Sequence, residues 1–202
     1  MQSSNNDKMK TTEAKTIYLI RHPETMAGEG VCYGQTDVDV APKVLEKAVA
    51  KVKGKLNGVR ANSCYSSPLQ RCAKLAEALF DRENIIYDAR LKELDFGRWE
   101  MQRWDALPEE DLSHWAKDFM HSHQHGGESY CELQQRFAAF WQMLSSHADE
   151  PALVVTHSGI IRAFLAQSLD APVSKVFSIQ VDYADVIEVL WYHDDYQEIR
   201  FL

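Results

Sequence analysis

Two histidines that follow apolar runs are the residues of this sequence whose placement suits chemistry best. His22 follows residues 16–20 with only Arg21 between them, and His157 comes directly after residues 152–156. Continuous apolar runs of this kind are typical of buried strands in an α/β sheet, and ligands of such sheets bind beyond the carboxyl ends of the strands. We therefore expect both histidines to face one crevice, where a neutral imidazole could attack a phosphorus atom.

Two arginines are placed to bind the phosphoryl group that such a reaction would transfer. Arg21 precedes His22, and guanidinium geometry suits bidentate contact with phosphoryl oxygens. Arg71 lies in the first turns of a predicted helix, where the helix N-terminus favours an anion. His157, as a cation or as a hydrogen-bond donor, would stabilise the charge on the transferring group. These four residues supply the positioning and the charge stabilisation that phosphoryl transfer needs.

The elements that must position these residues alternate between strands and helices. The sequence predicts strands at 16–20, 62–66, 85–87 and 152–156, and a final hairpin of 185–192 and 196–201 that turns at Asp194 and Asp195. Helices are predicted from Pro42, from Ser67 as N-cap with Pro68 as first helical residue, over 129–146, and after His157. Residues 98–120 are predicted to form short helices and loops over the site. This alternation favours a three-layer α/β fold with a mostly parallel sheet.

The length and composition of the sequence exclude some classes of protein and some kinds of partner. The 202 residues are 45% hydrophobic, enough for one domain, predicted at 15–202 after a flexible tail at 1–14. The net charge of −8 disfavours nucleic acid and anionic membranes as partners. No apolar stretch approaches the roughly 20 residues of a membrane helix. The tail lacks a signal-peptide pattern and the four cysteines form no C-x-x-C pair, so we expect a cytoplasmic protein. The sequence leaves a homodimer open.

The order of the motifs resembles the histidine phosphatase superfamily, whose members have the phosphoglycerate mutase-like fold. Five segments carry the resemblance, which spans nearly the whole chain after the tail: residues 21–25, 66–72, 94–100, 126–129 and 156–159. It implies that His22 is a nucleophile that forms a phosphohistidine, that Arg21, Arg71 and His157 bind the phosphate, and that Glu93 is the general acid. It also implies hydrolysis of a small-molecule phosphomonoester without a metal or another cofactor.

Glu93 is also a candidate acid on the evidence of its neighbours. The apolar residues 91, 94, 96 and 99 would desolvate its carboxyl and favour the protonated form, which can donate to a leaving alkoxide. An ordinary solvated glutamate is the alternative, and Asp95 and Glu100 are rival acids. Near the start of the 129–146 helix, Ser129 is expected to be a helix cap or, alternatively, a substrate contact, and Glu128 could steer a hydroxyl or a water.

The chain departs from the family pattern in two places. Pro23 stands where many relatives have glycine, so a backbone donor to phosphate is absent there. Many relatives that resemble mutases also carry an asparagine a few residues further on, where this chain has residues 26–30. Gln35 or Thr36 would have to replace that contact.

The loops at 30–38 and 99–105 narrow the resemblance to bacterial α-ribazole 5′-phosphate phosphatases of cobalamin nucleotide-loop assembly. Tyr33 and Trp99, with Trp104, offer flat apolar surfaces for an aromatic base, or they only pack a lid.

We also expect substrate contacts from Gln35 or Thr36 to a ribose, and from Thr25 and Ser158 within the two histidine segments. The rival functions are a broad sugar-phosphate phosphatase, a phosphoglycerate mutase-like enzyme and a non-catalytic module that binds phosphorylated ligands. The alternating His121, His123 and His125 lack helical spacing and a nearby acid, so no metal site is expected.

Overall fold

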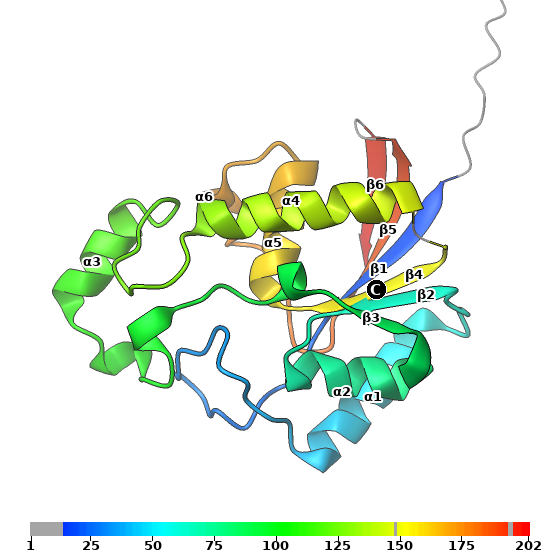
Figure 1. The fold of residues 1–202 in the computed structure, drawn as a ribbon, viewed down its shortest axis with the longest axis horizontal. Coiled ribbons are helices and arrows are strands. Elements are labelled where there is room, and N and C mark those ends of the chain that lie inside the picture. Colours follow the sequence, from blue (N-terminus) through cyan, green and yellow to red (C-terminus); the bar gives the residue numbers. More distant parts are fainter. Residues whose placement is uncertain (1–13, 148, 194–195) are drawn as a thin grey trace, which may run out of the picture.

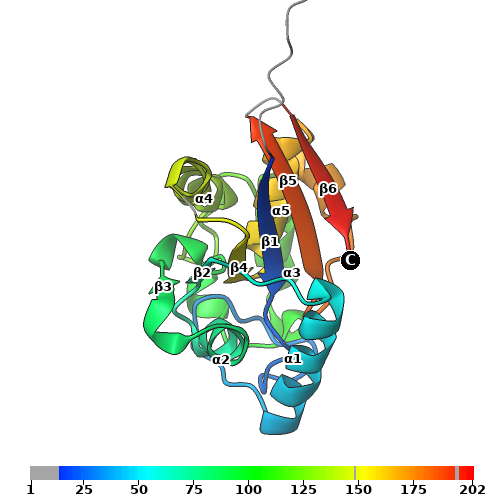
Figure 2. The same ribbon diagram turned by 90° about the vertical axis from the view of Figure 1, so that its right-hand side faces the viewer.

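The computed structural model describes residues 14–147, 149–193 and 196–202, and its centre is a six-stranded sheet of order β3-β2-β4-β1-β5-β6 (Figure 1). The strands are β1 (Lys15–Arg21), β2 (Ser63–Ser66), β3 (Ile85–Tyr87), β4 (Ala152–Thr156), β5 (Val186–His193) and β6 (Tyr196–Phe201). The first four are parallel, whereas β5 and β6 are antiparallel to their neighbours. β3 and β6 form the two edges (Figure 2). The mostly parallel sheet is therefore confirmed.

Helices cover both faces of the sheet. α1 (Pro42–Leu56) and α2 (Gln70–Leu79) lie on one face; α4 (Tyr130–His147), α5 (Ser158–Ser168) and the short α6 (Val173–Val176) lie on the other (Figure 1). Side chains of β1 alternate between the two layers: Ile17 and Leu19 pack with α4 and α5, and Tyr18 and Ile20 pack with α1 and α2. The three-layer fold predicted from the alternating pattern is confirmed.

The start of α2 differs from the prediction of a Ser67 N-cap. The helix begins at Gln70, and the backbone N–H of Gln70 donates to Asp37 Oδ1 at 2.7 Å. The acceptor thus comes from a loop more than thirty residues away, which no local pattern could show. The Ser67 hydroxyl is instead 2.9 Å from Nε2 of His157. Ser67 is therefore part of the histidine site.

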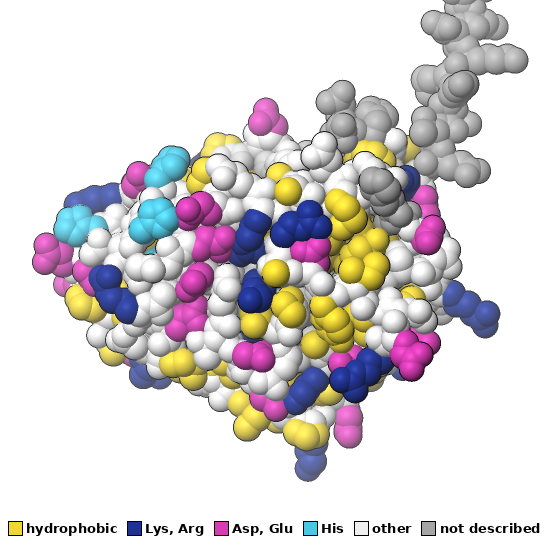
Figure 3. Space-filling view, viewed as in Figure 1, with side chains coloured by type: hydrophobic (Ala, Val, Ile, Leu, Met, Phe, Trp, Pro, Cys, Tyr) yellow, Lys and Arg dark blue, Asp and Glu magenta, His cyan; other side chains and the backbone are white. Residues whose placement is uncertain are grey.

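Residues 97–117 form short helices as predicted. They comprise the 3₁₀ turns Gly97–Trp99 and Trp104–Ala106 and the helix α3 (Glu109–Lys117). Two other 3₁₀ turns, Arg82–Asn84 and Ala89–Leu91, lie before this segment. A separate apolar cluster of Cys32, Trp99 and Leu107 supports this segment. On the face shown in Figure 3, acidic and basic side chains are interspersed, and the histidines gather at the end of the molecule where α3 lies.

Two predictions fall wholly or mainly outside the described residues: the tail at 1–14, of which only residue 14 is described, and the turn at Asp194 and Asp195. Within the ranges that the structure describes, no helix has the length and apolar character that crossing a membrane requires.

Candidate active site

The pairing of β1 with β4 brings the two histidines together. Arg21 lies opposite Thr156 in the parallel register, so the residue after each faces the same end of the sheet. The His22 backbone N–H donates to the Thr156 carbonyl at 2.9 Å, and the ring centroids of His22 and His157 are 5.0 Å apart. Both side chains are buried, with 2% and 0% exposure. The two rings are therefore neighbours at this end of the sheet, and His22 is the one that lines the cavity described below.

The His22 ring is held in one tautomer. Its Nδ1 lies 2.6 Å from the Pro23 carbonyl oxygen. Because a carbonyl can only accept, Nδ1 carries the proton and Nε2 keeps a free lone pair. Burial, together with the positive charges of Arg71 and Arg21, holds the pKa of His22 well below its usual value. The imidazole is therefore neutral at physiological pH, which is the form that can attack phosphorus.

His157 is also neutral, which decides between the two forms left open by the sequence. Arg71 Nε donates to its Nδ1 at 3.3 Å, so its Nε2 carries the proton and donates to Ser67 Oγ. Burial lowers its pKa far below the usual range, and the charge of Arg71 and the neighbouring His22 act in the same direction. His157 is therefore a hydrogen-bond donor rather than a cation.

The two arginines are held differently. Arg71 is fully buried, and its guanidinium donates to the carbonyl oxygens of Thr36 at 2.9 Å and Gly34 at 2.5 Å. Arg21 donates to the Val181 carbonyl at 2.6 Å, and its guanidinium carbon lies 4.0 Å from the Tyr183 ring centroid. These contacts fix both guanidinium groups without neutralising them, because carbonyl oxygens carry no net charge, and both cations act electrostatically on His22.

A cavity of about 300 Å³ opens onto this site. Six of the residues singled out from the sequence line it: Arg21, His22, Tyr33, Glu93, Trp104 and Ser158. Arg71 and His157 lie behind this wall and do not line the cavity. Much of the remaining wall is aromatic and comes from Phe96, Trp115, Tyr130, Phe177 and Tyr183. A larger hollow of about 620 Å³ lies between the ends of α1 and α2, but it contains neither histidine, so it is not the site.

Glu93 lies at the N-terminus of α5, inside the cavity. Its Oε2 accepts from the Gly159 N–H at 3.1 Å and the Ser158 hydroxyl at 3.4 Å, and its Oε1 accepts from the Leu94 N–H at 3.0 Å. Two of the apolar neighbours named from the sequence, Leu94 and Phe96, line the same cavity, and hydrogen-bond donors reach both carboxyl oxygens.

The two rival acids have other roles. Asp95 accepts from the Gly97 N–H at 2.8 Å, and Glu100 accepts from the backbone N–H groups of Gln35 at 2.8 Å, Thr36 at 2.6 Å and Phe96 at 3.0 Å. Burial alone would raise the pKa of Glu100, but these bonds and one from the Thr36 hydroxyl together hold it below its usual value. Neither rival lines the cavity.

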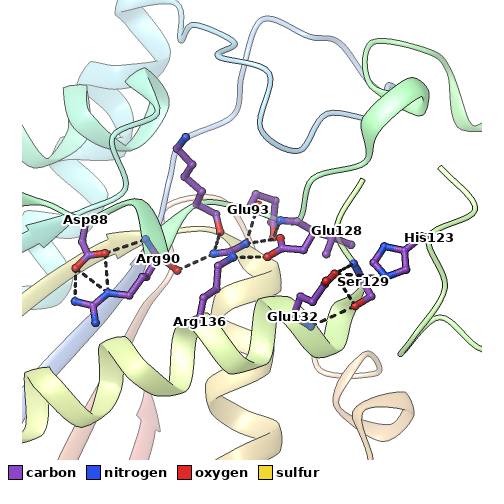
Figure 4. Close-up of polar contacts among 10 residues, drawn as sticks. Asp88, Arg90, Glu93, His123, Glu128, Ser129, Glu132 and Arg136 are labelled. Atoms are coloured by element: carbon purple, nitrogen blue, oxygen red, sulfur yellow. Dashed lines mark hydrogen bonds and ion pairs between the residues drawn. The ribbon is translucent and has the colours of Figure 1, made fainter. Parts of the chain in front are cut away.

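An arginine that sequence reasoning missed holds the Glu93 segment in place (Figure 4). Arg136 of α4 donates from Nη1 to the carbonyls of Arg90 and Lys92, each at 2.6 Å, and from Nη2 to the Glu93 carbonyl at 3.0 Å. Its Nε and Nη2 also donate to the two carboxylate oxygens of Glu128, at 2.6 and 2.8 Å. Glu128 therefore orients Arg136, and the expectation that it steers a hydroxyl or a water is wrong.

The Ser129 side chain caps α4, which confirms the first of its two predicted roles. Its backbone N–H donates to Glu132 Oε2 at 2.8 Å, and its hydroxyl accepts from the Glu132 N–H at 3.3 Å. This reciprocal pair is a capping box.

Four predicted substrate contacts do not line the cavity. Gln35 and Thr36 are held by Glu100, and the Thr25 hydroxyl accepts from the Ala27 N–H at 3.4 Å. Trp99 is 1% exposed and packs against Cys32 and Leu107, so for this ring the packing alternative applies.

Tyr33 and Trp104 do line the cavity. Trp115, Phe177, Tyr183 and Arg162 were missed because they come from four separate segments with no common motif.

The three histidines of the 121–125 loop have separate partners. His121 pairs with Asp118 at 3.0 Å, and Nδ1 of His123 lies 2.9 Å from the Gly127 carbonyl. Nδ1 of His125 accepts from the Gly127 N–H at 3.0 Å.

We expect the free energy of unfolding to fall as the pH falls from about 6.5. In the unfolded chain each histidine takes up a proton near that pH, whereas His22 and His157 stay neutral in the folded protein. The unfolded state then binds more protons, so each residue contributes a loss of about 1.4 kcal/mol per pH unit until its folded pKa is reached. Urea unfolding between pH 8 and 5 measures this slope.

The exposed His121 provides the control for this experiment, since His121→Asn is expected to keep the wild-type slope. His125, whose pKa burial also lowers, adds to the loss in the same direction. A stability that stays constant or rises on acidification to pH 5 would contradict the neutral, buried histidines.

Comparisons with known proteins agree with this geometry. A family model described as the histidine phosphatase superfamily (branch 1) matches residues 17–201. The adenosylcobalamin/alpha-ribazole phosphatase of Escherichia coli (strain K12) is 30% identical over 173 residues, which cover 82% of this chain and 85% of that protein. A putative phosphoserine phosphatase 2 of Hydrogenobacter thermophilus is 25% identical over 181 residues, covering 87% and 89%.

Solved structures show the same relationship. The crystal structure of the alpha-ribazole phosphatase from Shigella flexneri has a TM-score of 0.80 and 26% identity to this chain, and the match covers 93% of this chain and 95% of that one. The family match spans almost all of the described residues. The chain therefore belongs to the histidine phosphatase superfamily, branch 1, and it is an enzyme that hydrolyses phosphomonoesters.

Proposed function

We propose that the enzyme removes the 5′-phosphate of α-ribazole 5′-phosphate through a phosphohistidine at His22. The observation that carries the proposal is the neutral His22 ring, with Nδ1–H bonded to the Pro23 carbonyl, on the wall of a cavity that also holds Glu93. A nucleophile, a carboxyl and the guanidinium of Arg21 on the wall of one cavity, with the buried Arg71 acting electrostatically on His22, suit hydrolysis through a covalent intermediate.

The proposed reaction has two displacements. In the first, His22 Nε2 attacks phosphorus, the bond from phosphorus to the leaving oxygen breaks, and Glu93 gives a proton to the alkoxide. Arg21, Arg71 and His157 stabilise the charge on the phosphoryl oxygens. In the second, water attacks phosphorus, the Glu93 carboxylate takes its proton, and the bond between phosphorus and His22 breaks to release phosphate.

The substrate proposal rests on the cavity wall and on the relatives. Tyr33, Trp104, Trp115 and Phe177 supply aromatic faces on which a flat base can pack. Proteins named as alpha-ribazole phosphatases in Escherichia coli and Shigella flexneri are similar to this chain over more than four fifths of its length.

The test is to compare kcat/KM for α-ribazole 5′-phosphate with kcat/KM for phosphoserine, 3-phosphoglycerate and fructose phosphates, without added metal. We expect α-ribazole 5′-phosphate to be preferred by about 100-fold or more, because substrates without the base leave the aromatic wall unfilled. Equal or faster turnover of the other esters would remove the α-ribazole proposal and favour a broad sugar-phosphate phosphatase. Interconversion of phosphoglycerates would favour the mutase-like alternative.

A further inference from the structure

Several side chains that line the proposed substrate cavity carry a buried hydrogen-bond donor without a partner. Among the described residues, six buried side-chain polar atoms lack a hydrogen-bond partner, and three of these belong to cavity residues: Arg21 Nε, Trp115 Nε1 and Arg162 Nε. All three are donors. A buried donor without a partner costs free energy, so a side-chain adjustment that brings such a donor to a ligand acceptor would be favourable. Arg162 also has a second donor group, Nη1, that makes no hydrogen bond to the described residues.

The phosphoryl group accounts for only one of these donors. Arg21 is next to His22 in the proposed phosphate pocket, whereas Arg162 and Trp115 line other parts of the same cavity, where the proposed reaction would hold the leaving alcohol. Arg162 lies one helical turn after Ser158 on α5, and its guanidinium carbon is 5.3 Å from the Phe177 ring centroid. Trp115 is on α3, and Phe119 stands between its ring and that of Phe177 at centroid distances of 6.1 and 5.4 Å.

The charge of Arg162 is poorly compensated. Its guanidinium makes one hydrogen bond to the described residues, and that bond is long: 3.4 Å from Nη2 to the Ile179 carbonyl. Burial lowers its pKa, and the nearby carboxylate of Glu93 opposes that effect. By contrast, every nitrogen of the Arg136 guanidinium has an acceptor. An arginine retained in a cavity with an unused donor has the contacts of a ligand-binding residue rather than those of a structural one.

We propose that Arg162, assisted by the indole N–H of Trp115, binds an acceptor group of the leaving alcohol and thereby determines which phosphomonoesters the enzyme prefers. The proposal rests on the proposed function insofar as this cavity holds the leaving alcohol. A ribose hydroxyl or base nitrogen of α-ribazole and a carboxylate of a phosphorylated acid are acceptors of the kind required. The experiment distinguishes these sources.

The experiment compares Arg162→Met with the wild type on three esters. Phenyl phosphate has no acceptor in its leaving group beyond the bridging oxygen, α-ribazole 5′-phosphate has neutral acceptors, and phosphoserine has a carboxylate. We expect the ratio of kcat/KM for the acceptor-bearing substrate to kcat/KM for phenyl phosphate to fall about 10- to 100-fold. Trp115→Phe, which removes only the N–H donor, should lower the same ratio by a smaller factor. Arg200→Met, on β6 and outside the cavity, is the control.

Two further measurements keep the test decisive. If Arg162→Met does not fold, Arg162→Lys retains the charge but removes the Nε donor. In that variant, inhibition by dephosphorylated α-ribazole should weaken, whereas inhibition by inorganic phosphate should keep its wild-type constant.

Equal losses on phenyl phosphate and on both other esters would overturn the role in specificity, and so would no loss on any of them. If the wild type ignores α-ribazole 5′-phosphate but Arg162→Met selectively loses phosphoserine turnover, the proposed substrate fails while the role of Arg162 stands.

Discussion

Replacing His22 with alanine is expected to lower kcat by on the order of 10⁴-fold or more for every phosphomonoester. The variant keeps Arg21, Arg71 and His157 but has no atom that can form the covalent intermediate. Steady-state phosphate release measures the loss, and acid-labile labelling of the wild type by a ³²P-labelled substrate, followed by peptide mapping, locates the adduct. The label is expected at His22 because Nε2 of this residue holds the free lone pair.

The control is His121→Ala, which removes an exposed histidine paired with Asp118 at 3.0 Å and is expected to keep wild-type turnover. Thermal unfolding of His22→Ala separates loss of chemistry from loss of fold. The nucleophile assignment fails if the label maps to another residue, or if His22→Ala retains the wild-type rate.

Replacing Glu93 with glutamine is expected to lower kcat by about 10²- to 10³-fold for alkyl phosphates and by much less for p-nitrophenyl phosphate. An alkoxide is a strong base and needs a proton as it leaves, whereas nitrophenolate leaves without one. The amide still fits the space, but it cannot supply a proton to the alkoxide. The measured quantity is the ratio of the losses on the two classes of ester.

A second variant tests the position of the Glu93 carboxylate while leaving Glu93 itself unchanged. A Cβ at Gly159 would collide with Glu93 Oε1, while the backbone of Gly159 does not require glycine, so Gly159→Ala should displace the carboxyl and reproduce the selective loss on alkyl esters. Gly54→Ala, where a Cβ meets nothing within 4 Å, is the matched control. Equal losses on alkyl and aryl esters in Glu93→Gln would contradict a general acid at this position.

The sequence predicted the parts of the site that follow directly from strands. The runs before His22 and His157 identified β1 and β4, and the rule that ligands bind at carboxyl ends placed both histidines in one crevice. Their contact also required the parallel register of Arg21 with Thr156, which periodicity alone does not give. Local patterns thus located the candidate histidines but not the distances between them.

The predictions that failed concern side chains whose partners are distant in sequence. Ser67 looked like a helix cap, but Asp37 accepts the bond from Gln70 instead. Trp99 and Trp104 lie five residues apart in one loop, yet the first is packed inside and the second lines the cavity. Arg136 and Arg162 belong to no local motif, because the groups that they face are brought to them by the fold.

The bonds that Glu100 accepts have a consequence for building chimeras between relatives. One carboxylate accepts from Gln35 and Thr36 on one loop and from Phe96 on another, and a Cβ at Gly34 would overlap the Leu94 carbonyl. The two loops therefore pack closely against each other, and their contact leaves no room for a Cβ at Gly34. If only one of the two loops is replaced with that of a relative, the new loop will not fit the remaining one. Both loops therefore have to be exchanged together.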